Sequence, residues 1–511
     1  MSRNEFTRSA GILMAVSSLP SPYGIGTFGK EAYKFVDFVK ECGHKYWQVL
    51  PLGPTTYGDS PYQSFSAFAG NPYFIDMDIL IEEGLLDRED VLSYDWGEDA
   101  SNVDYEKMYS SRFKVLHHAY ERFKLLCEQG TRAEENAIDM VQSYEAFLTE
   151  NKYWLEDYAL FMAVKDYYGG KCWTEWGRSI KFRRHEAIVQ YSVILKNEIG
   201  FWKFVQFEFT KQWNKLKGYA NENGVEIIGD IPIYMGIDSS DVWANTEEFQ
   251  LDCDLKPVKV AGVPPDAFSQ LGQKWGNPLY DWDKMEQNGF TWWRRRMSAS
   301  AKLYDVIRID HFIGIVKFYE IPADMPDARQ GQYQKGPGQK LLDVIGDAIG
   351  DKKLIAEDLG VEVPEVKEIL NNNGYPGMKV LEFAFGGERD NPHLPHCYTK
   401  NCVVYGGTHD NETLMGYYSD RTDEELAYAI DYLDTNDRAR MVDNTFRAAY
   451  ASVADLAVFA VQDILKLDNS ARMNLPSSLG INWKWRMLKG QLTQEHVCNM
   501  RHLASVFGRG R

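Results

Sequence analysis

Eight short apolar runs recur along the chain, with patterns typical of helices between them. A strand alternates with period two, whereas an amphipathic helix repeats its apolar residues every three to four positions. The first two runs enclose an amphipathic stretch from Glu31 to Cys42, which predicts a strand–helix–strand unit and hence a parallel sheet. The eight predicted strands are 11–16, 46–50, 225–230, 306–310, 354–357, 378–383, 402–405 and 456–461. This pattern predicts an α/β fold, a (β/α)8 TIM barrel with its site at the carboxyl ends of the strands.

Three segments depart from this alternation. Between about residues 76 and 200 the strand pattern vanishes, which predicts a large, mostly helical insertion between the second and third strands. Segment 51–74 is aromatic and rich in Gly, Pro and Ser, and its length favours a functional loop. Segment 262–280 is rich in Gly and Pro and carries Trp275, so it is either a surface connection or an active-site lid. We expect residues 1–511 to form a single catalytic barrel that includes all three.

The predicted strand 306–310 carries two charges in an otherwise apolar run. In an extended chain Arg308 and Asp310 share one face, and Ile307 and Ile309 share the other. A buried charge needs a partner or a task. Arg308 and Asp310 are therefore either a structural ion pair or a strand-end carboxylate that its own arginine keeps ionised.

Acidic residues also follow two other predicted strands. Asp310 ends the fourth strand, Glu357 and Asp358 follow the fifth, and Asp410 follows the seventh. Each acid alone could be a helix cap. In a barrel, however, these strand ends converge on one pocket. Glycoside chemistry needs one carboxylate that attacks the anomeric carbon and a second acid that protonates the leaving oxygen.

Composition narrows the possible ligands. The formal net charge is −18, which disfavours nucleic acid and anionic membranes, and no apolar run is long enough to span a membrane. Aromatic residues make up 14% of the chain, and exposed aromatic faces suit sugar rings. The seven cysteines form no CxxC pair, which indicates reduced thiols in a cytoplasmic protein. Four aspartates between 238 and 254 lack the spacing of a calcium loop, so we expect no metal and no organic cofactor.

Several sequence blocks resemble one family specifically, the 4-α-glucanotransferases known as amylomaltases or disproportionating enzymes, which are relatives of the α-amylases. The resemblance extends from about residue 12 to residue 486, and the loop blocks carry more weight than any single acidic block. The acidic blocks are Arg308–Phe312, Ala356–Gly360 and Thr408–Asn411, and the others are Ser17–Ser21, Gly58–Gln63, Asp230–Tyr234, Gly262–Asp266 and Gly272–Pro278.

The resemblance implies a role for each acid. By this likeness Asp310 is the nucleophile, Glu357 the general acid/base and Asp410 the transition-state stabiliser. Strand alternation alone does not choose between Glu357 and Asp358, so that choice depends on the resemblance. The predicted substrate-binding residues are Tyr62, Asp230, Trp275, Arg308, His311, His409, Asn411 and Asn474.

Some of these substrate contacts have a structural alternative. Asp230 is either a hydrogen-bonding residue of the rim or a partner of Arg308. His311 and His409 are either donors to sugar hydroxyls or structural histidines. Segment 474–478 departs from the Pro-Gly-Thr common in the family, which affects the detail of that rim loop and not the chemistry.

The expected activity is transfer of a segment of an α-1,4-glucan to the 4-hydroxyl of glucose or another maltodextrin, by a retaining mechanism. One alternative is a hydrolase of the amylase type, in which water is the acceptor. A second is a catalytically inactive barrel that binds glucan. We expect a cytoplasmic monomer or homodimer whose partners are glucan and glucose.

Overall fold

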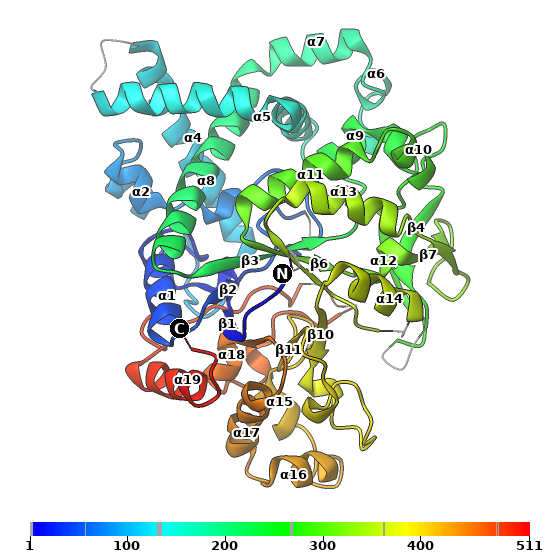
Figure 1. The fold of residues 1–511 in the computed structure, drawn as a ribbon. Helices are drawn as coiled ribbons and strands as arrows, with labels where there is room; N and C mark the ends of the chain where they lie inside the picture. Colours follow the sequence, from blue (N-terminus) through cyan, green and yellow to red (C-terminus); the bar gives the residue numbers. More distant parts are fainter. Residues whose placement is uncertain are drawn as a thin grey trace.

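The computed structural model describes residues 4–510, except 57, 130–134, 266–268, 361–362, 477 and 479. Tyr57 of the aromatic loop, Asp266 of the predicted lid and Ser477 of the rim segment thus lie outside the described residues. An eight-stranded sheet forms the centre of the molecule, in the order β10-β11-β12-β1-β2-β3-β6-β9 (Figure 1). Its strands are β1 (Ser9–Leu13), β2 (Tyr46–Gln48), β3 (Glu226–Pro232), β6 (Val306–Asp310), β9 (Lys353–Ala356), β10 (Gly377–Val380), β11 (Cys402–Tyr405) and β12 (Leu456–Ala460).

Every pair of neighbours in this sheet is parallel. The two outer strands, β9 and β10, also approach each other, because the amide of Ala356 donates to the carbonyl of Pro376 at 3.0 Å. The sheet is therefore a nearly closed barrel. The predicted (β/α)8 fold is confirmed, and all eight predicted strands occur in it.

Two of the predicted strands that end early are followed by 3-10 turns. The first stops at Leu13, and Val16–Ser18 form a 3-10 turn instead. The sixth stops at Val380, and Leu381–Phe383 form another 3-10 turn, η6. Both turns are largely buried, and a short apolar run does not by itself distinguish a strand from a buried turn.

The described residues between 77 and 222, which include most of the predicted insertion 76–200, are mostly helical. The longest helices of this region, α5 and α8, pack together in the upper left part of Figure 1. Phe204, Phe207 and Trp213 are among the buried residues of α8, which runs on to Glu222 and leads into β3. The helices of this region are α2 (Met77–Glu82), α3 (Arg88–Leu92), α4 (Tyr105–Gln129), α5 (Glu135–Tyr167), α6 (Arg178–Lys181), α7 (His185–Ile194) and α8 (Lys196–Glu222).

The remaining helices connect the other barrel strands or follow the last one. α1 (Lys30–Glu41) joins β1 to β2, and α11 (Thr291–Leu303) precedes β6. The others are α9 (Ser240–Ala244), α10 (Trp282–Gln287), α12 (Ile313–Val316), α13 (Gln339–Ile349), α14 (Pro364–Asn373), α15 (Leu414–Ser419), α16 (Ala427–Leu433), α17 (Arg438–Ala451), α18 (Val461–Ile464) and α19 (Gln494–Val506). Within the described residues, no helix combines the length and the apolar character that crossing a membrane requires.

A second, antiparallel sheet was not predicted. Its order is β5-β4-β7-β8, formed by β4 (Lys259–Val263), β5 (Gln273–Pro278), β7 (Lys317–Pro322) and β8 (Gln332–Lys335). Segment 262–280, predicted as a loop, thus contains the end of β4 and all of β5. Gly262 permits this pairing, because a Cβ at that position would lie 2.1 Å from the carbonyl oxygen of Gln273.

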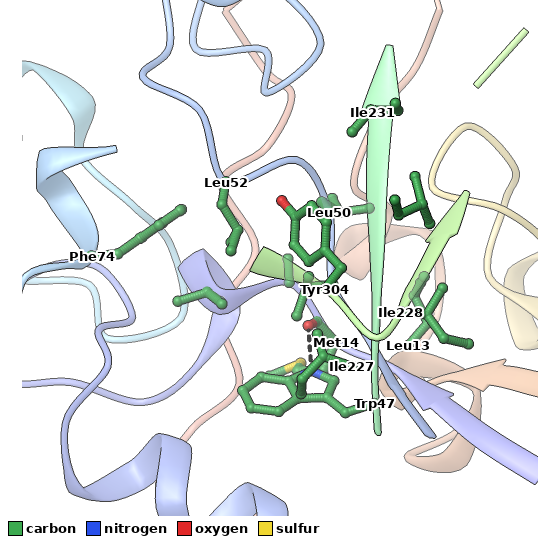
Figure 2. Close-up of a cluster of buried hydrophobic side chains, with 14 of the residues drawn as sticks. Leu13, Met14, Trp47, Leu50, Leu52, Phe74, Ile227, Ile228, Ile231 and Tyr304 are labelled. Atoms are coloured by element: carbon green, nitrogen blue, oxygen red, sulfur yellow. Dashed lines mark hydrogen bonds between the residues drawn. The ribbon is translucent and has the colours of Figure 1, made fainter. Parts of the chain in front are cut away.

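Apolar side chains from neighbouring strands fill the space between the sheet and the surrounding loops. Figure 2 shows one such cluster, around Trp47 of β2, Ile227 and Ile228 of β3, and Tyr304. The Trp47 indole is fully buried, and its N–H donates to the Met14 carbonyl at 2.9 Å. This packing fixes the strands whose carboxyl ends carry the polar residues described next.

Candidate active site

The carboxyl ends of the barrel strands open into a cavity of about 240 Å³. Part of its wall comes from the loop after β2 and from β5 of the second sheet. The rest comes from the ends of β3 and β6 and from the segments that follow β3, β6, β11 and β12. The residues that line it are Ser60, Tyr62, Gln63, Pro232, Ile233, Tyr234, Gln273, Trp275, Asn277, Asp310, His311, His409, Asp410, Asn474, Pro476 and Trp483.

Asp310 ends β6 in the cavity wall, and its side chain is 27% exposed. Behind it, the Arg308 guanidinium is almost fully buried. One nitrogen of Arg308 donates to Asp230 at 2.5 Å and to Asp310 at 3.2 Å. Parallel pairing explains the arrangement, because Asp230 of β3 lies opposite Arg308 in the register. Arg308 therefore serves two carboxylates, and Asp230 receives the shorter bond.

Glu357 directly follows β9, the strand beside β6. One oxygen of its carboxyl group accepts the His311 amide at 2.7 Å, and the other accepts the Leu359 amide at 3.0 Å. The Glu357 backbone bonds in turn to Ile309 and Phe312 of the β6 segment. These bonds hold the Glu357 carboxyl group against the segment that follows Asp310, although Glu357 is not among the residues that line the cavity.

The two carboxyl groups differ in protonation. Burial raises the pKa of Asp310 to about 6, although the Arg308 charge opposes the rise. Burial, assisted by the negative charge of Asp310, raises the pKa of Glu357 to about 8. Asp310 is therefore the more acidic of the two groups, and Glu357 keeps its proton to higher pH. Two acids with pKa values on opposite sides of the working pH can act as nucleophile and proton donor.

Asp410 reaches the cavity from the turn after β11, and its side chain is 47% exposed. The Asn474 amide donates to one oxygen of the Asp410 carboxylate at 2.5 Å. Arg472 fixes the backbone of both residues, donating to the Asp410 carbonyl at 2.7 Å and to the Asn474 carbonyl at 2.9 Å. Asp410 is therefore held in place by the chain segment that follows β12.

Tyr62 and His409 form a stacked pair in the wall. Their ring centroids are 4.4 Å apart and their planes differ by 20°. The Tyr62 hydroxyl donates to Asp230 at 2.7 Å and lies 2.9 Å from His409 Nδ1. The loop after β2 is thereby joined to the Arg308–Asp230 pair and to the Asp410 turn.

Trp275 of β5 meets His311 edge to face, with ring centroids 4.8 Å apart. Burial lowers the pKa of His311 to about 4, so its imidazole is neutral at pH 7. A neutral imidazole can donate one hydrogen bond and accept another. His311 also has a left-handed backbone, with φ of 51°. The sharp turn after β6 allows its side chain to face Trp275.

The structure brings most of the predicted site residues together. Those in the cavity wall are Tyr62, Trp275, Asp310, His311, His409, Asp410 and Asn474. Asp230 and Arg308 lie behind this wall and are buried. Asn411 is directed toward protein partners, because it accepts from Thr408 and donates to Glu382.

Sequence reasoning missed several residues of the wall. Gln63 donates to Asn277 at 3.0 Å, which connects the loop after β2 to β5 across the cavity. Tyr234 lies beside both Trp275 and His311, and Trp483 beside Tyr62 and His409. Gln63, Tyr234 and Asn277 belong to blocks that carry the family resemblance, which was the available signal. Among the described residues, no group of three or more His, Cys, Asp or Glu could hold a metal ion.

Comparison with known proteins identifies the family. The family model described as 4-alpha-glucanotransferase matches residues 14–492. A 4-alpha-glucanotransferase of Clostridium butyricum is 46% identical over 97% of this chain and 100% of its own length. A 4-alpha-glucanotransferase of Thermus thermophilus is 45% identical over 98% of this chain and 99% of its own length.

A solved structure extends the likeness to three dimensions. An amylomaltase from Streptococcus agalactiae in complex with acarbose matches with a TM-score of 0.93 and 41% identity, over 99% of this chain and 100% of that chain. The amylomaltase of Corynebacterium glutamicum shares the fold, with a TM-score of 0.77 at 17% identity over 99% of this chain and 75% of that one. The chain therefore belongs to the 4-alpha-glucanotransferase family and is an enzyme of that activity.

Proposed function

We propose that the enzyme transfers a segment of an α-1,4-glucan to the 4-hydroxyl of glucose or another maltodextrin, by double displacement in the cavity of about 240 Å³. The observation that carries this proposal is the pair of acids on neighbouring strands. Asp310, with a pKa of about 6, and Glu357, with a pKa of about 8, have the protonation states of a nucleophile and an acid at pH 7.

In the first half-reaction, a carboxylate oxygen of Asp310 attacks the anomeric carbon of the donor. The bond from that carbon to the glycosidic oxygen breaks, and the Glu357 proton moves to the departing oxygen. The products are a glycosyl ester on Asp310 and a shortened glucan. Glu357 is left as a carboxylate.

In the second half-reaction, Glu357 accepts the proton of the acceptor 4-hydroxyl. The hydroxyl oxygen attacks the anomeric carbon, and the bond to Asp310 breaks. Two inversions at the same carbon give net retention, so the α-1,4 linkage is formed again. Asp310 returns as a carboxylate and Glu357 as an acid.

The other carboxylates have supporting roles. Asp410, oriented by Asn474 at 2.5 Å, stabilises the positive charge that develops on the sugar ring. Arg308 favours the ionised form of Asp310, which preserves the nucleophile. Asp230 positions Arg308 and the Tyr62 hydroxyl, and this placement favours the structural alternative for Asp230.

Aromatic and imidazole groups bind the sugar rings. Tyr62 and Trp275 offer ring faces or edges, and His311 and His409 offer nitrogens to the sugar hydroxyls. The described part of segment 262–280 serves as a cover over bound glucan, with Trp275 on β5 as its contact. Asn411 holds the Asp410 turn through its hydrogen bonds to protein groups, and it does not itself bind the sugar.

Transfer requires that a sugar hydroxyl outcompete water. Water is present at about 55 M, whereas a well-oriented bound group reaches effective molarities of roughly 10⁵ M or more. A glucan acceptor held between Tyr62 and Trp275 would gain this advantage and would displace water from the glycosyl ester.

We further propose that the enzyme works in the cytoplasm, in maltodextrin and glycogen or starch metabolism, as a monomer or homodimer. All seven cysteines are free thiols, which suits a reducing compartment. Size-exclusion chromatography with light scattering would measure the oligomeric state directly.

Incubation with maltotriose tests the proposed activity. A transferase yields glucose together with maltopentaose and longer chains, whereas a hydrolase yields only shorter sugars. The Asp310→Asn variant is the control for contaminating enzymes. A product mixture without any elongated chain contradicts the proposal and favours hydrolysis, and the absence of any turnover favours an inactive glucan-binding barrel.

A further inference from the structure

The turn that carries Asp410 rests on a buried acid, Glu382. Asn411, the residue after Asp410, accepts hydrogen bonds from the Thr408 amide and the Thr408 hydroxyl, both at 2.9 Å. The same hydroxyl accepts the Asp410 amide at 3.3 Å. The Asn411 side-chain amide then donates to Glu382 Oε2 at 3.3 Å. A chain of hydrogen bonds therefore leads from the backbone of Asp410 to the Glu382 carboxyl group.

Glu382 lies in η6, directly after β10, and is only 9% exposed. Its Oε1 atom is buried and has no hydrogen-bond partner among the described residues. Gly407 packs against this atom, since a Cβ at position 407 would lie 2.6 Å from it. A carboxylate needs donors on both oxygens, and here the long bond from Asn411 reaches only one of them.

The charges around Glu382 also disfavour its ionised form. Asp463, at the start of α18, and Glu412, in the turn, both raise the pKa of Glu382, and Arg472 acts in the opposite direction. Glu412 is itself paired with Arg421 at 2.8 Å, so Arg421 has an ionised partner of its own. The titratable and charged groups that face Glu382 are Asp463, Glu412, Arg472, Arg421, Tyr417 and Tyr418.

We propose that Glu382 is a positioning residue that works as a neutral carboxylic acid: Oε1 carries the proton, and Oε2 accepts from Asn411 and thereby fixes the Asp410 turn. The inference rests on the proposed role of Asp410 and deepens it. In the neutral form one oxygen is a carbonyl acceptor, which suits the Asn411 amide. The other is a hydroxyl. Burying a hydroxyl without a partner costs less than burying a carboxylate that has a donor on only one of its oxygens.

The direction of the pKa shift of Glu382 agrees with this geometry. Burial raises the pKa of Glu382 well above its ordinary value near 4.5, and the charges of Asp463 and Glu412 raise it further. The folded protein then keeps a proton that the unfolded chain releases above about pH 4.5. Stability contributed by this proton is therefore complete at low pH and falls as pH rises toward the folded-state pKa.

The substitutions Glu382→Gln and Glu382→Ala separate the two parts of the proposal. Gln keeps a carbonyl acceptor and is always neutral, so we expect kcat on maltotriose within about threefold of wild type. Ala removes the acceptor of the Asn411 bond, so we expect kcat to fall about tenfold while KM changes little. Rescue by Gln, which keeps the acceptor and never ionises, shows that a neutral group suffices at this position. An Ala variant with a kcat close to that of wild type, or a Gln variant as impaired as Ala, overturns the proposal.

The pH dependence of unfolding in urea tests whether Glu382 carries a proton, independently of activity. If Glu382 is neutral in the folded state, the unfolding constant of wild type divided by that of Glu382→Gln rises with pH above about 4.5, by up to about tenfold per pH unit until the pH reaches the folded-state pKa of Glu382. A ratio that does not change with pH means an ionised Glu382 and overturns the proposal. Asp463→Asn serves as a matched control, because it removes the neighbouring buried acid whose pKa is about 7. The pH-dependent ratio must persist when both proteins carry this substitution.

An infrared difference spectrum offers a second readout that does not require reversible unfolding. Wild type minus Glu382→Gln should show the carbonyl stretching band of a protonated carboxyl group at pH 7, and a carboxylate band there would contradict the proposal. Asp410→Asn distinguishes failure of the proposed function from failure of this inference. Full activity of Asp410→Asn removes the role of Asp410, whereas the infrared band and the unfolding ratio still report the state of Glu382.

Discussion

The buried Arg308 cation sets the pH range in which Asp310 can act as a nucleophile. Its guanidinium lies 3.2 Å from Asp310 and 2.5 Å from Asp230, and it is almost fully buried. Replacing Arg308 with Met removes the only side chain seen to donate to Asp310 among the described residues, and it leaves two carboxylates facing each other. We predict that the acid limb of the pH–rate profile moves upward.

The size of this effect follows from the geometry. An opposite charge in contact with a carboxyl group changes its pKa by about 1 to 3 pH units. We expect the wild-type acid limb to have its midpoint near the pKa of Asp310, about 6. If the midpoint moves up by two pH units, the ionised fraction at pH 7 falls from ~0.9 to ~0.1, about a tenfold loss of rate from this cause alone.

The Asp230→Asn substitution should have the opposite effect on the pKa of Asp310. It removes the competing carboxylate, whose charge raises the pKa of Asp310, and it leaves Arg308 to serve Asp310 alone. We predict that its acid limb moves to lower pH. Arg308→Lys keeps the charge and should shift the limb less than Met, although lysine cannot reproduce the planar guanidinium.

The assay is the pH dependence of kcat/KM on maltotriose, recorded from pH 4.5 to 9 for all four proteins. Breaking a buried ion pair costs about 3–5 kcal/mol, so thermal unfolding must first show that each variant is folded. Shifts in the same direction for Arg308→Met and Asp230→Asn would refute the reasoning, as would equal losses at every pH.

Three further predictions concern other parts of the site. Asp310→Asn should lower transfer by roughly 10⁴-fold or more, because an amide cannot form the glycosyl ester, and near-normal turnover of purified variant would exclude Asp310 as the nucleophile. Trp275→Ala should lose transfer more than hydrolysis, seen by chromatography as more free glucose relative to elongated product; equal losses would leave Trp275 a general contact. Asn474→Ala should lower kcat by about 10- to 100-fold, because a hydrogen bond to a charged group is worth about 1.5–3 kcal/mol, and an unchanged kcat would mean that Asp410 needs no such support.

The barrel was predictable because its strands are buried and apolar. Strands β6 and β11 have the predicted bounds, 306–310 and 402–405. The second sheet was not predictable in the same way. Strands β5 (QKWGNP) and β8 (QYQK) are polar, and β5 contains Gly and Pro. They are strands because β4 and β7 pair with them, and a sequence pattern does not contain that tertiary contact.

The acids of the site could be inferred because parallel strand ends converge. The direction in which a side chain points could not be inferred from the sequence. Asn411 adjoins Asp410, yet its side chain is directed to Glu382, which is 29 positions earlier in the chain. Arg308 adjoins Asp310 on one strand face, yet its shorter bond is to Asp230 of the neighbouring strand. Such pairings depend on strand register and on packing between distant segments.

The central claim is that Asp310 carries the sugar between the two half-reactions. Glu357→Gln, which cannot activate an acceptor, should accumulate this intermediate when the donor is α-glucosyl fluoride, because fluoride leaves without protonation. Mass spectrometry of the digested protein then locates the adduct. We predict that the peptide containing Asp310 gains the mass of one glucosyl residue. The same adduct on Asp358 or Asp410, or no adduct while fluoride is released, would contradict the account.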